Sequence, residues 1–439
     1  MSNAILTPTI YAKAGLAFLK NSLVASKKVS LQYTDEFKKI GQSVKAKRAP
    51  EYTVGRGRVA TAQDVLEGEV EVKLNRQRHV MVKFNSMEET LSVDALLKSK
   101  SLEAAMGQLA QQVDSELCGI AMRGTYNLVG TPGTSINSTR DFFYAPQRLA
   151  NMAVPDMDRH GLLNPDDAFE LAGAFTGGAS TSIPGEIAKS AIEMAEIPLI
   201  GGIKPVMTQS VQTHTPGSWA TGGTREVKGA GQSVSYNTAS VRNTWSQGLL
   251  VDGFSNGATF RVGDVFNIEG VYAVNPRSKV TLPFLQDFVV MPGTDGAGGY
   301  VADVVDGETE TTAGTYTFST GGSSEITIQI SPPIIVSGAF QTVSAAPADN
   351  ADLTLRGTAS TPHYNNLVYQ RDAFALCMAK PTAPKSGEWD FATDPETGIA
   401  IRYWRFSDGV NDEHYDRFDV IFGATCLDPR LATRLCGTS

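Results

Sequence analysis

The feature that most constrains the fold is a change in sequence character near residue 225. From there to about residue 358, the chain consists of short apolar or alternating runs separated by turns rich in Gly and Pro. These runs are Thr259–Val262, Val265–Ile268, Phe288–Met291, Thr315–Phe318 and Ile326–Ile330. Short strands at this spacing predict a small barrel or sandwich. Because the chain returns to mixed structure after about residue 360, the two ends of this β domain must lie close together, as in an inserted domain.

A long helix is predicted well before the β region. Apolar residues recur there every three or four positions and form one stripe, which consists of Leu102, Met106, Leu109, Val113, Leu117 and Ile120. A helix from Leu102 to Arg123 would be about 33 Å long. Gly124 follows it and predicts a C-terminal cap.

Two alternating runs precede this helix. Val70, Val72 and Leu74 lie on one side of a strand, and the pattern resumes after residues 75–78, which have the sequence NRQR. We interpret this as a β-hairpin with a charged turn. A lone hairpin is marginally stable in water, so it must dock on its own chain or on a neighbour.

The sequences near both ends of the chain predict elements that are stable only when they pack against other parts of a protein. Residues 5–50 show helical spacing of Tyr11, Leu16, Leu19 and Leu23 but are too polar to form a core of their own. Near the other end, Phe418–Ala424 is a continuous apolar run, which predicts a strand buried in a central sheet. Pro146 suits the first turn of another helix.

Charge is distributed unevenly along the chain. The net charge is −8 overall. Residues 1–60 hold eleven basic and three acidic residues, a net charge of +8, whereas residues 225–356 hold seven basic and thirteen acidic residues, a net charge of −6. A basic arm and an acidic insert suggest two faces that meet different partners, although a solvated charged tail explains the arm equally well.

No motif nominates a catalytic, cofactor or metal site. Residues 55–60 fit GxGxxA, but the following residues alternate like a strand, whereas a dinucleotide site requires a helix there. The five histidines form neither HxxxH nor HExxH, and no GxSxG nominates a nucleophilic serine. The four cysteines form no CxxC pair and are interpreted as free thiols. The sequence contains no run of 18 apolar residues, so it predicts no membrane-spanning helix. We expect no enzymatic activity, and the enzyme alternative has no local support.

Four arginines are the candidate site residues. Arg56, Arg58, Arg76 and Arg78 lie on extended segments, where they could contact phosphates or a neighbour's carboxylates. We favour a role in a subunit interface for all four. Gly55 and Gly57 would let the segment around the first two arginines flex.

Four ordered segments resemble the P22-type family of phage coat proteins. They are the stretch from Val65 to Gly124 with the following GTPGT of residues 130–134, Met152 to Pro165, Gly202 to Gly217 with the later GDVFNIEGVYAVNPRSK of residues 263–279, and DRFDVIFGATCLDPRLATRLCG of residues 416–437. No single segment is decisive, but four in this order are hard to produce by chance.

The resemblance implies an α+β, HK97-like capsid fold with an inserted β-barrel. Its expected parts are an N-terminal arm (1–50), an extended loop (51–88), a peripheral domain with a spine helix (89–165), an axial domain (166–224), the inserted barrel (225–358) and a return to both domains (359–439). The implied function is a major capsid protein that self-assembles through pentamers and hexamers into an icosahedral shell around double-stranded DNA.

The resemblance also implies partners and a location. Besides copies of itself, the chain would meet a scaffolding protein, a portal and packaged DNA, the last without sequence specificity, and it would meet no membrane. It would assemble in the host cytoplasm and end in the virion, without a cofactor. The alternative function is a β-rich phage tail or adhesion protein, which would explain the strands but not the long helix.

Overall fold

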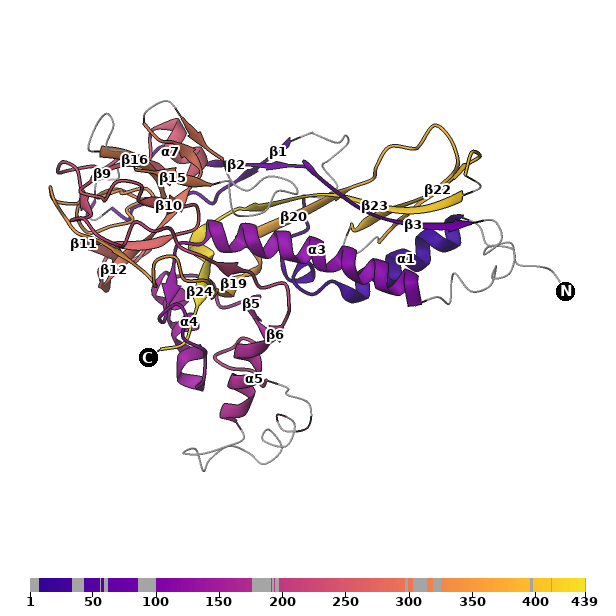
Figure 1. The fold of residues 1–439 in the computed structure, drawn as a ribbon. Helices are drawn as coiled ribbons and strands as arrows, with labels where there is room; N and C mark the ends of the chain where they lie inside the picture. The colour runs from indigo at the N-terminus through magenta and orange to yellow at the C-terminus, as the bar shows by residue number, and fades with distance from the viewer. Residues whose placement is uncertain are drawn as a thin grey trace. The chain divides into compact units, whose positions relative to one another are not determined.

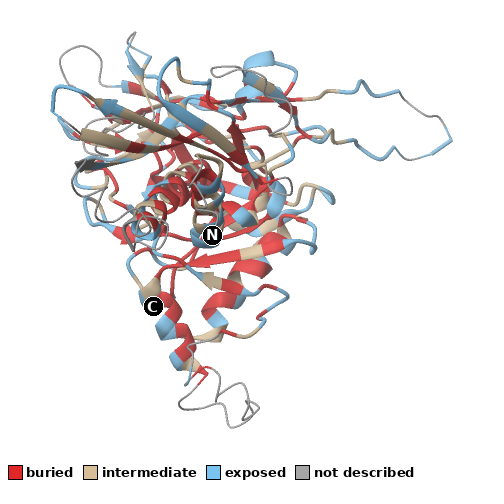
Figure 2. Ribbon diagram, turned by 90° about the vertical axis from the view of Figure 1, so that its right-hand side faces the viewer, coloured by how far each residue is buried: buried red, intermediate tan, exposed pale blue. Residues whose placement is uncertain are grey.

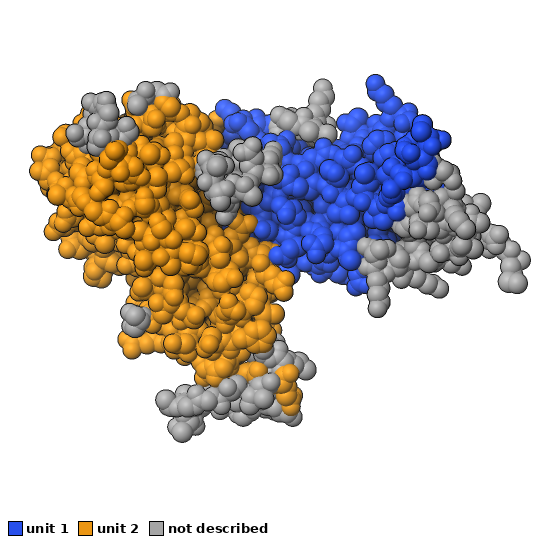
Figure 3. All heavy atoms as spheres, viewed as in Figure 1, with its two compact units in different colours: residues 1–45, 71–118, 374–425 blue, residues 46–70, 119–373, 426–439 orange. Residues whose placement is uncertain are grey.

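The computed structural model describes residues 8–33, 43–55, 57–58, 62–85, 100–175, 191, 193, 197–296, 299–302, 314–318, 325–394, 398–411 and 413–438. The chain forms two compact units, each assembled from three separate segments. Unit 1 comprises residues 1–45, 71–118 and 374–425, and unit 2 comprises residues 46–70, 119–373 and 426–439 (Figure 3). None of the helices in the described ranges has the length and apolarity needed to cross a membrane.

Unit 1 is built on a sheet whose central strand is β23 (Glu413–Cys426) (Figure 1). This strand pairs with β20 (Phe374–Ala379), β22 (Ala400–Asp408) and β3 (Arg76–Asn85), and β22 pairs in turn with β21 (Glu388–Thr393). Phe418, Val420 and Phe422 of β23 are buried. The central buried strand predicted from the sequence is therefore confirmed.

The predicted hairpin is wrong in its pairing, although both of its strands exist. β2 (Glu69–Lys73) pairs with β1 (Ser43–Lys47), while β3 pairs antiparallel with β23 over its whole length. Arg76 and Arg78 belong to β3 itself, opposite Phe422 and Val420, so the charged residues do not form a turn. Alternation identified the strands correctly but gave no information about which neighbour each strand pairs with.

Two α-helices within the described residues contribute to unit 1. α1 (Pro8–Ser22) packs against β21 and β22, and its Tyr11 ring stacks on Tyr403 with 5.2 Å between centroids. α1 of the arm therefore packs on a later part of its own chain, whereas the sequence predicted only that the arm packs on something else. α3 (Lys100–Gly124) confirms the long helix, and five of its six stripe residues are buried, whereas Ile120 is half-buried. Buried residues are drawn in red in Figure 2. Residues of α3 up to Cys118 belong to unit 1 and the remainder to unit 2.

Unit 2 contains a five-stranded mixed sheet in the order β4-β24-β19-β5-β6. These strands are β4 (Leu128–Val129), β24 (Ala432–Leu435), β19 (Asn366–Gln370), β5 (Arg159–Leu163) and β6 (Pro205–Met207). The helices α4 (Thr139–Asn151) and α5 (Pro165–Ala174) share a hydrophobic core with this sheet. Pro146 lies in the middle of α4, not in its first turn, because the helix begins earlier with Ser138 as its N-cap.

The inserted β domain of unit 2 is a closed barrel of six antiparallel strands in the order β17-β11-β12-β16-β9-β8. Its strands are β8 (Glu226–Val227), β9 (Gln247–Asp252), β11 (Val265–Val274), β12 (Thr281–Met291), β16 (Glu325–Ser331) and β17 (Leu353–Leu355). The first and last strands meet: Leu353 N–H donates to Arg225 O at 2.9 Å, and Val227 N–H donates to Ala351 O at 3.0 Å. The ends of the insertion are therefore adjacent, as the sequence required.

Shorter elements surround the barrel. β10 (Thr259–Arg261) pairs with β15 (Thr315–Thr317), β13 (Gly293–Thr294) pairs with β14 (Tyr300–Val301), and α7 (Ala239–Thr244) lies between β8 and β9 in sequence. β7 (Thr213–His214) pairs with β18 (His363–Tyr364), so the chain segments on either side of the insertion are hydrogen-bonded to each other. Trp219 is fully buried and stacks on Phe260 in the barrel core.

Candidate subunit interface

The four predicted interface arginines occupy different surroundings. Arg56 lies outside the described residues. Arg58 is exposed on the extended loop, whereas Arg76 and Arg78 lie on β3 in unit 1, with side chains 11% and 21% exposed. The structure therefore separates an exposed arginine on the loop from two arginines packed against the body of unit 1.

Glu116 of α3 explains the packing of the two β3 arginines. Arg78 Nε donates to Glu116 Oε1 at 2.6 Å, and Arg76 Nε lies 3.7 Å from Glu116 Oε2. The Glu116 side chain is itself only 13% exposed. Sequence reasoning missed this carboxylate because Glu116 lies off the apolar stripe and 38 residues away from Arg78. The role of Arg76 and Arg78 in a subunit interface remains a prediction.

A side-chain clamp closes the neck of the extended loop. Gln63 Oε1 accepts hydrogen bonds from the Thr53 backbone N–H and hydroxyl, both at 2.9 Å, and Gln63 Nε2 donates to Thr53 O at 2.6 Å. We call residues 54–62, which this clamp encloses, the loop tip. The tip sequence VGRGRVATA contains two arginines and no acidic residue, and Val54 is 94% exposed.

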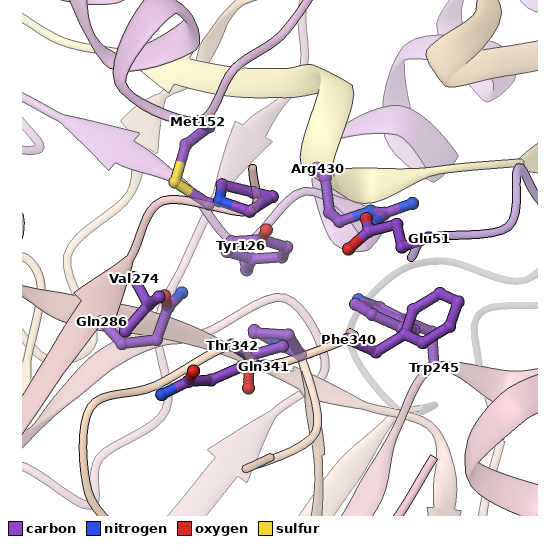
Figure 4. A pocket seen from close by; sticks show the side chains of 12 residues that line it. Glu51, Tyr126, Met152, Trp245, Val274, Gln286, Phe340, Gln341, Thr342 and Arg430 are labelled. Carbon is purple, nitrogen blue, oxygen red and sulfur yellow. The ribbon is translucent and has the colours of Figure 1, made fainter. Parts of the chain in front are cut away.

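The base of the same loop is held by a cluster of charged and aromatic side chains (Figure 4). Arg430 donates to Asp428 through Nε at 2.9 Å and Nη2 at 2.7 Å, and it also pairs with Glu51 at the start of the loop. The guanidinium groups of Arg48 and Arg430 lie 5.5 and 5.0 Å from the ring centroid of Trp245. Cation–π contacts of this kind add to the ion pairs because the site is desolvated.

Burial and charge act against each other in this loop-base cluster. Burial lowers the pKa of the Arg48 guanidinium. Burial alone would raise the pKa of Asp428, but the guanidinium groups of Arg430 and Arg48 hold that pKa below its usual range. The cavity between Tyr126, Trp245 and Arg430 has a volume of about 10 Å³, which admits no more than a single water molecule. The cluster is an anchor for the loop and has no room for a substrate.

Two buried carboxylates connect the barrel to the rest of unit 2. Asp287 of β12 accepts from Leu128 N–H at 3.1 Å and from Arg148 Nη1 at 3.3 Å. Asp264 accepts from the Gly217 backbone at 3.1 Å and from Trp219 Nε1 at 2.9 Å. Each carboxylate accepts from residues that precede the insertion in the sequence, so loss of either carboxylate would leave buried donors unpaired.

A hollow of about 400 Å³ lies beside the loop base, and we call it the loop hollow. One wall is formed by the loop residues Glu51, Gln63, Asp64 and Leu66, and the other by residues 234–237 and 335–340 of the inserted domain. Two residues that line it, Ile335 and Phe340, belong to a small hydrophobic cluster with Tyr236 and Trp245, against which Leu66 packs. This cluster is separate from the barrel core.

The described residues show no cluster typical of a metal site or an activated nucleophile. No group of three His, Cys, Asp or Glu side chains is arranged to hold a metal ion in the part of the chain that the structure describes. All four cysteines are free, and burial raises the pKa of Cys426 and of Cys436 to about 12. Thiols with such pKa values stay protonated and unreactive at neutral pH.

The comparisons with known proteins identify the family. The model of the family described as "P22 coat protein - gene protein 5" matches residues 16–437. A major capsid protein of Acyrthosiphon pisum secondary endosymbiont phage 1 is 22% identical over 371 residues, which cover 83% of this chain and 80% of that protein.

Solved structures give weaker similarities. A Mycobacterium phage Che8 structure has a TM-score of 0.41 at 11% identity, and the alignment covers 94% of this chain and 90% of the Che8 chain. The capsid structure of the cyanophage P-SCSP1u has a TM-score of 0.42 at 9% identity, with 91% and 84% coverage. Because the family model spans nearly the whole sequence, the chain belongs to the P22 coat protein family and is a major capsid protein of a tailed bacteriophage.

Proposed function

We propose that this chain assembles through pentamers and hexamers into an icosahedral shell that encloses double-stranded DNA, and that it has no enzymatic activity. The observation that carries the proposal is the family match over residues 16–437. An extended loop with an exposed cationic tip and a rigidly anchored base supports it, since such a loop can reach a neighbour while its origin stays fixed. The six expected segments, from arm to C-terminal return, remain the proposed domain boundaries.

The proposed partners follow from the same family. We propose a scaffolding protein, a portal and non-specific contact with packaged DNA, with assembly in the host cytoplasm before the protein is found in the virion. Contacts between subunits can each be weak, because a closed symmetric shell makes them act together. Arg56, Arg58, Arg76 and Arg78 remain proposed interface residues, with Arg58 the most accessible of those that the structure describes.

The test is electron microscopy of the chain expressed in bacteria, alone and with a candidate scaffolding protein. Closed shells, spirals or tubes are the expected result. A persistent small oligomer under both conditions would contradict the proposed assembly.

A further inference from the structure

We infer that His214 and His363 form an acid-sensitive latch, which holds together the two chain segments that flank the inserted β domain and releases them in acid. We call these two residues the histidine latch. The two segments are β7, which precedes the insertion, and β18, which follows it. The inference goes beyond the family match and the proposed function, because it concerns a single chain before any assembly.

The two histidine rings face each other across a short strand pair. β7 and β18 pair over two residues each, and His214 lies directly opposite His363. Their ring centroids are 5.9 Å apart with the ring planes at 83°, and the two residues are 5% and 7% exposed. Like charges directly opposite each other destabilise a strand pair. A charge on both rings would therefore act against the pairing that joins the two segments.

A buried carboxylate lies beside one ring of the latch. Asp264 is fully buried, and its Oδ1 lies 2.9 Å from His214 Nε2. The same carboxylate accepts from Gly217 N–H at 3.1 Å, from Trp219 Nε1 at 2.9 Å and from Arg261 N–H at 3.0 Å. One carboxylate carries one negative charge, so it can balance an imidazolium at His214 but not a second one across the strand pair.

Three arginines also approach the latch. Arg434 of β24 is 1% exposed, and its Nη1 donates to Gly263 O at 2.9 Å. Arg123 of α3 lies near the same glycine, since a Cβ placed on Gly263 would lie 3.2 Å from both Arg123 Cγ and His214 Cε1. Arg261 Nη1 donates at 3.2 Å to the carbonyl of the residue that follows His214. A second imidazolium would therefore meet more positive than negative charge.

His363 resists protonation while the latch is closed. Its Nδ1 lies 3.4 Å from the carbonyl oxygen of Thr361. Burial, followed by the neighbouring His214, lowers the pKa of His363 to about 4; Arg434 acts in the same direction, and Asp264 opposes it only weakly. In an open latch that water reaches, the ring would titrate near 6.5. Between these two pH values the open form binds the additional proton, so acid shifts the equilibrium toward the open form.

Opening of the latch would leave the barrel closed. The first and last strands of the barrel are joined by their own backbone hydrogen bonds, from Leu353 to Arg225 and from Val227 to Ala351. None of these residues belongs to β7 or β18. Acid should therefore free the neck of the inserted domain while the barrel itself stays folded.

Hydrogen–deuterium exchange of the unassembled full-length chain tests the inference. The readout is the protection factor of the backbone amides, which is corrected for the intrinsic effect of pH on exchange. From pH 7 to pH 4.5, we expect the protection factors of β7 and β18 to fall by about 10- to 100-fold. The barrel strands β9, β11 and β12 should keep theirs, because local opening exposes only the amides of the segment that opens.

Two variants and a matched control identify the group responsible. His363→Gln keeps a polar side chain that cannot become charged, so it should give equal protection factors at the two pH values. His414→Gln removes a half-buried histidine of unit 1 and should retain the full fall. Thr213→Cys/Tyr364→Cys places two thiols at exposed positions directly opposite each other. Its disulfide should keep the latch protected at pH 4.5 until the disulfide is reduced.

Each outcome decides for or against the latch. Equal protection factors at both pH values in the unmodified chain would overturn the inference, and so would a fall that persists in His363→Gln, because another group would then be responsible. Loss of protection in the barrel strands at the same pH would indicate global unfolding and would also overturn it. If His363→Gln does not fold, the disulfide variant decides. Protection lost with the disulfide intact would contradict the latch, and protection lost only after reduction would support it.

Discussion

The carboxylate of Asp114 on α3 accepts a hydrogen bond from the backbone N–H of Ser26 at 2.9 Å. The same carboxylate accepts from Val24 N–H at 2.7 Å and from Ala25 N–H at 3.0 Å, and the Ser26 hydroxyl donates to it as well. Asp114 is 2% exposed. One buried side chain of the long helix therefore holds the segment that follows α1, and charge-assisted bonds of this kind are stronger than neutral ones.

Replacing Asp114 with Asn should loosen this segment. The amide keeps one acceptor oxygen and places an NH₂ group where an acceptor was, so the free energy of unfolding of unit 1 should fall by about 2–3 kcal/mol. Urea unfolding and the rate of tryptic cleavage at Lys27 and Lys28 would measure it. Glu103→Gln makes the same chemical change at an exposed position in the first turn of α3 and should cost no more than the helix-dipole contribution of about 0.3–1 kcal/mol. Equal stability of the two variants would contradict the role of Asp114.

Two nearby glycines with similar backbone angles should respond differently to Ala. Gly130 has φ +85° and Gly133 has φ +90°, but a Cβ on Gly130 would lie 2.1 Å from Cys436 O, whereas a Cβ on Gly133 would meet nothing within 4 Å. Gly133→Ala should cost only the left-handed backbone penalty of about 1–2 kcal/mol. Gly130→Ala should cost more than about 4 kcal/mol, because it also separates β4 from β24. Similar thermal midpoints for the two variants would contradict the steric argument.

His363 should make unit 2 sensitive to acid. Burial, together with the nearby His214, lowers the pKa of His363 to about 4. The unfolded chain would titrate near 6.5. Between these two values the unfolded state binds the additional proton, so stability rises with pH through this window. As the pH falls from 6.5 to about 4, we expect this residue to cost about 1–3 kcal/mol.

The histidine contribution can be isolated by substitution. His363→Gln should reduce the difference between the urea midpoints measured at pH 7 and pH 4.5. His414→Gln removes a half-buried histidine whose ring lies 2.9 Å from the Ser407 hydroxyl, and it should keep the difference of the unmodified chain. An unchanged pH difference in His363→Gln would show that other groups cause the acid sensitivity.

The sequence predicted element types better than element partners. Periodicity identified α3 and the barrel strands, because a helix stripe and strand alternation are local properties of the chain. Adjacent insertion ends also followed, since the chain must return to the unit it left. The hairpin pairing failed because β3 finds its partner more than 300 residues away, at β23. No local pattern encodes that choice.

The anchors of the candidate interface could not be predicted for the same reason. Asp114 and Glu116 are single carboxylates whose partners come from distant segments, and neither belongs to a motif. Asp428 binds Arg430, only two residues away, but Arg430 pairs in turn with the distant Glu51. The arginine pattern was visible, but its division into exposed Arg58 and packed Arg76 and Arg78 depended on knowing where Glu116 lies. Burial, which decides the role of a charged residue, is a property of the fold.

A row of acidic residues crosses five adjacent strand positions of the barrel. Glu325 of β16 lies opposite Asp252 of β9, and Asp252 lies opposite Glu226 of β8. Glu226 in turn lies opposite Asp352, and the backbone carbonyl of Asp352 accepts from the backbone N–H of Glu269 on β11. The next residues inward, among them Ile326, Val251 and Val227, are buried, so the acidic side chains point outward. Lys228 pairs with Asp252 at 2.8 Å. Like charges directly opposite each other destabilise a sheet.

Neutralising one member of this row should therefore stabilise the barrel. Asp352→Asn should raise the free energy of unfolding at low salt by about 0.2–1 kcal/mol. The gain should disappear in 1 M salt, where the screening length is about 3 Å. Parallel urea titrations at the two salt concentrations would measure it, and each serves as the control for the other. A loss of stability at low salt would show that Asp352 has a favourable partner.

Charge reversal should separate the arginine on the loop from the two arginines on β3. Arg58→Glu should leave the monomer as stable as the parent, because this side chain is exposed, but it should lower the yield of shells. Arg78→Glu places a second carboxylate against Glu116, at a position where the parent has a 2.6 Å bond. That variant should lose about 1–3 kcal/mol of stability, because the partly buried Glu116 would face a like charge and would keep only its longer contact with Arg76. The double variant Arg78→Glu/Glu116→Arg restores opposite charges and should recover much of that loss. Urea unfolding of the monomers and electron microscopy of the assembled material measure the two effects separately. If Arg78→Glu is fully stable yet fails to form shells, the ion pair with Glu116 is dispensable and Arg78 acts between subunits.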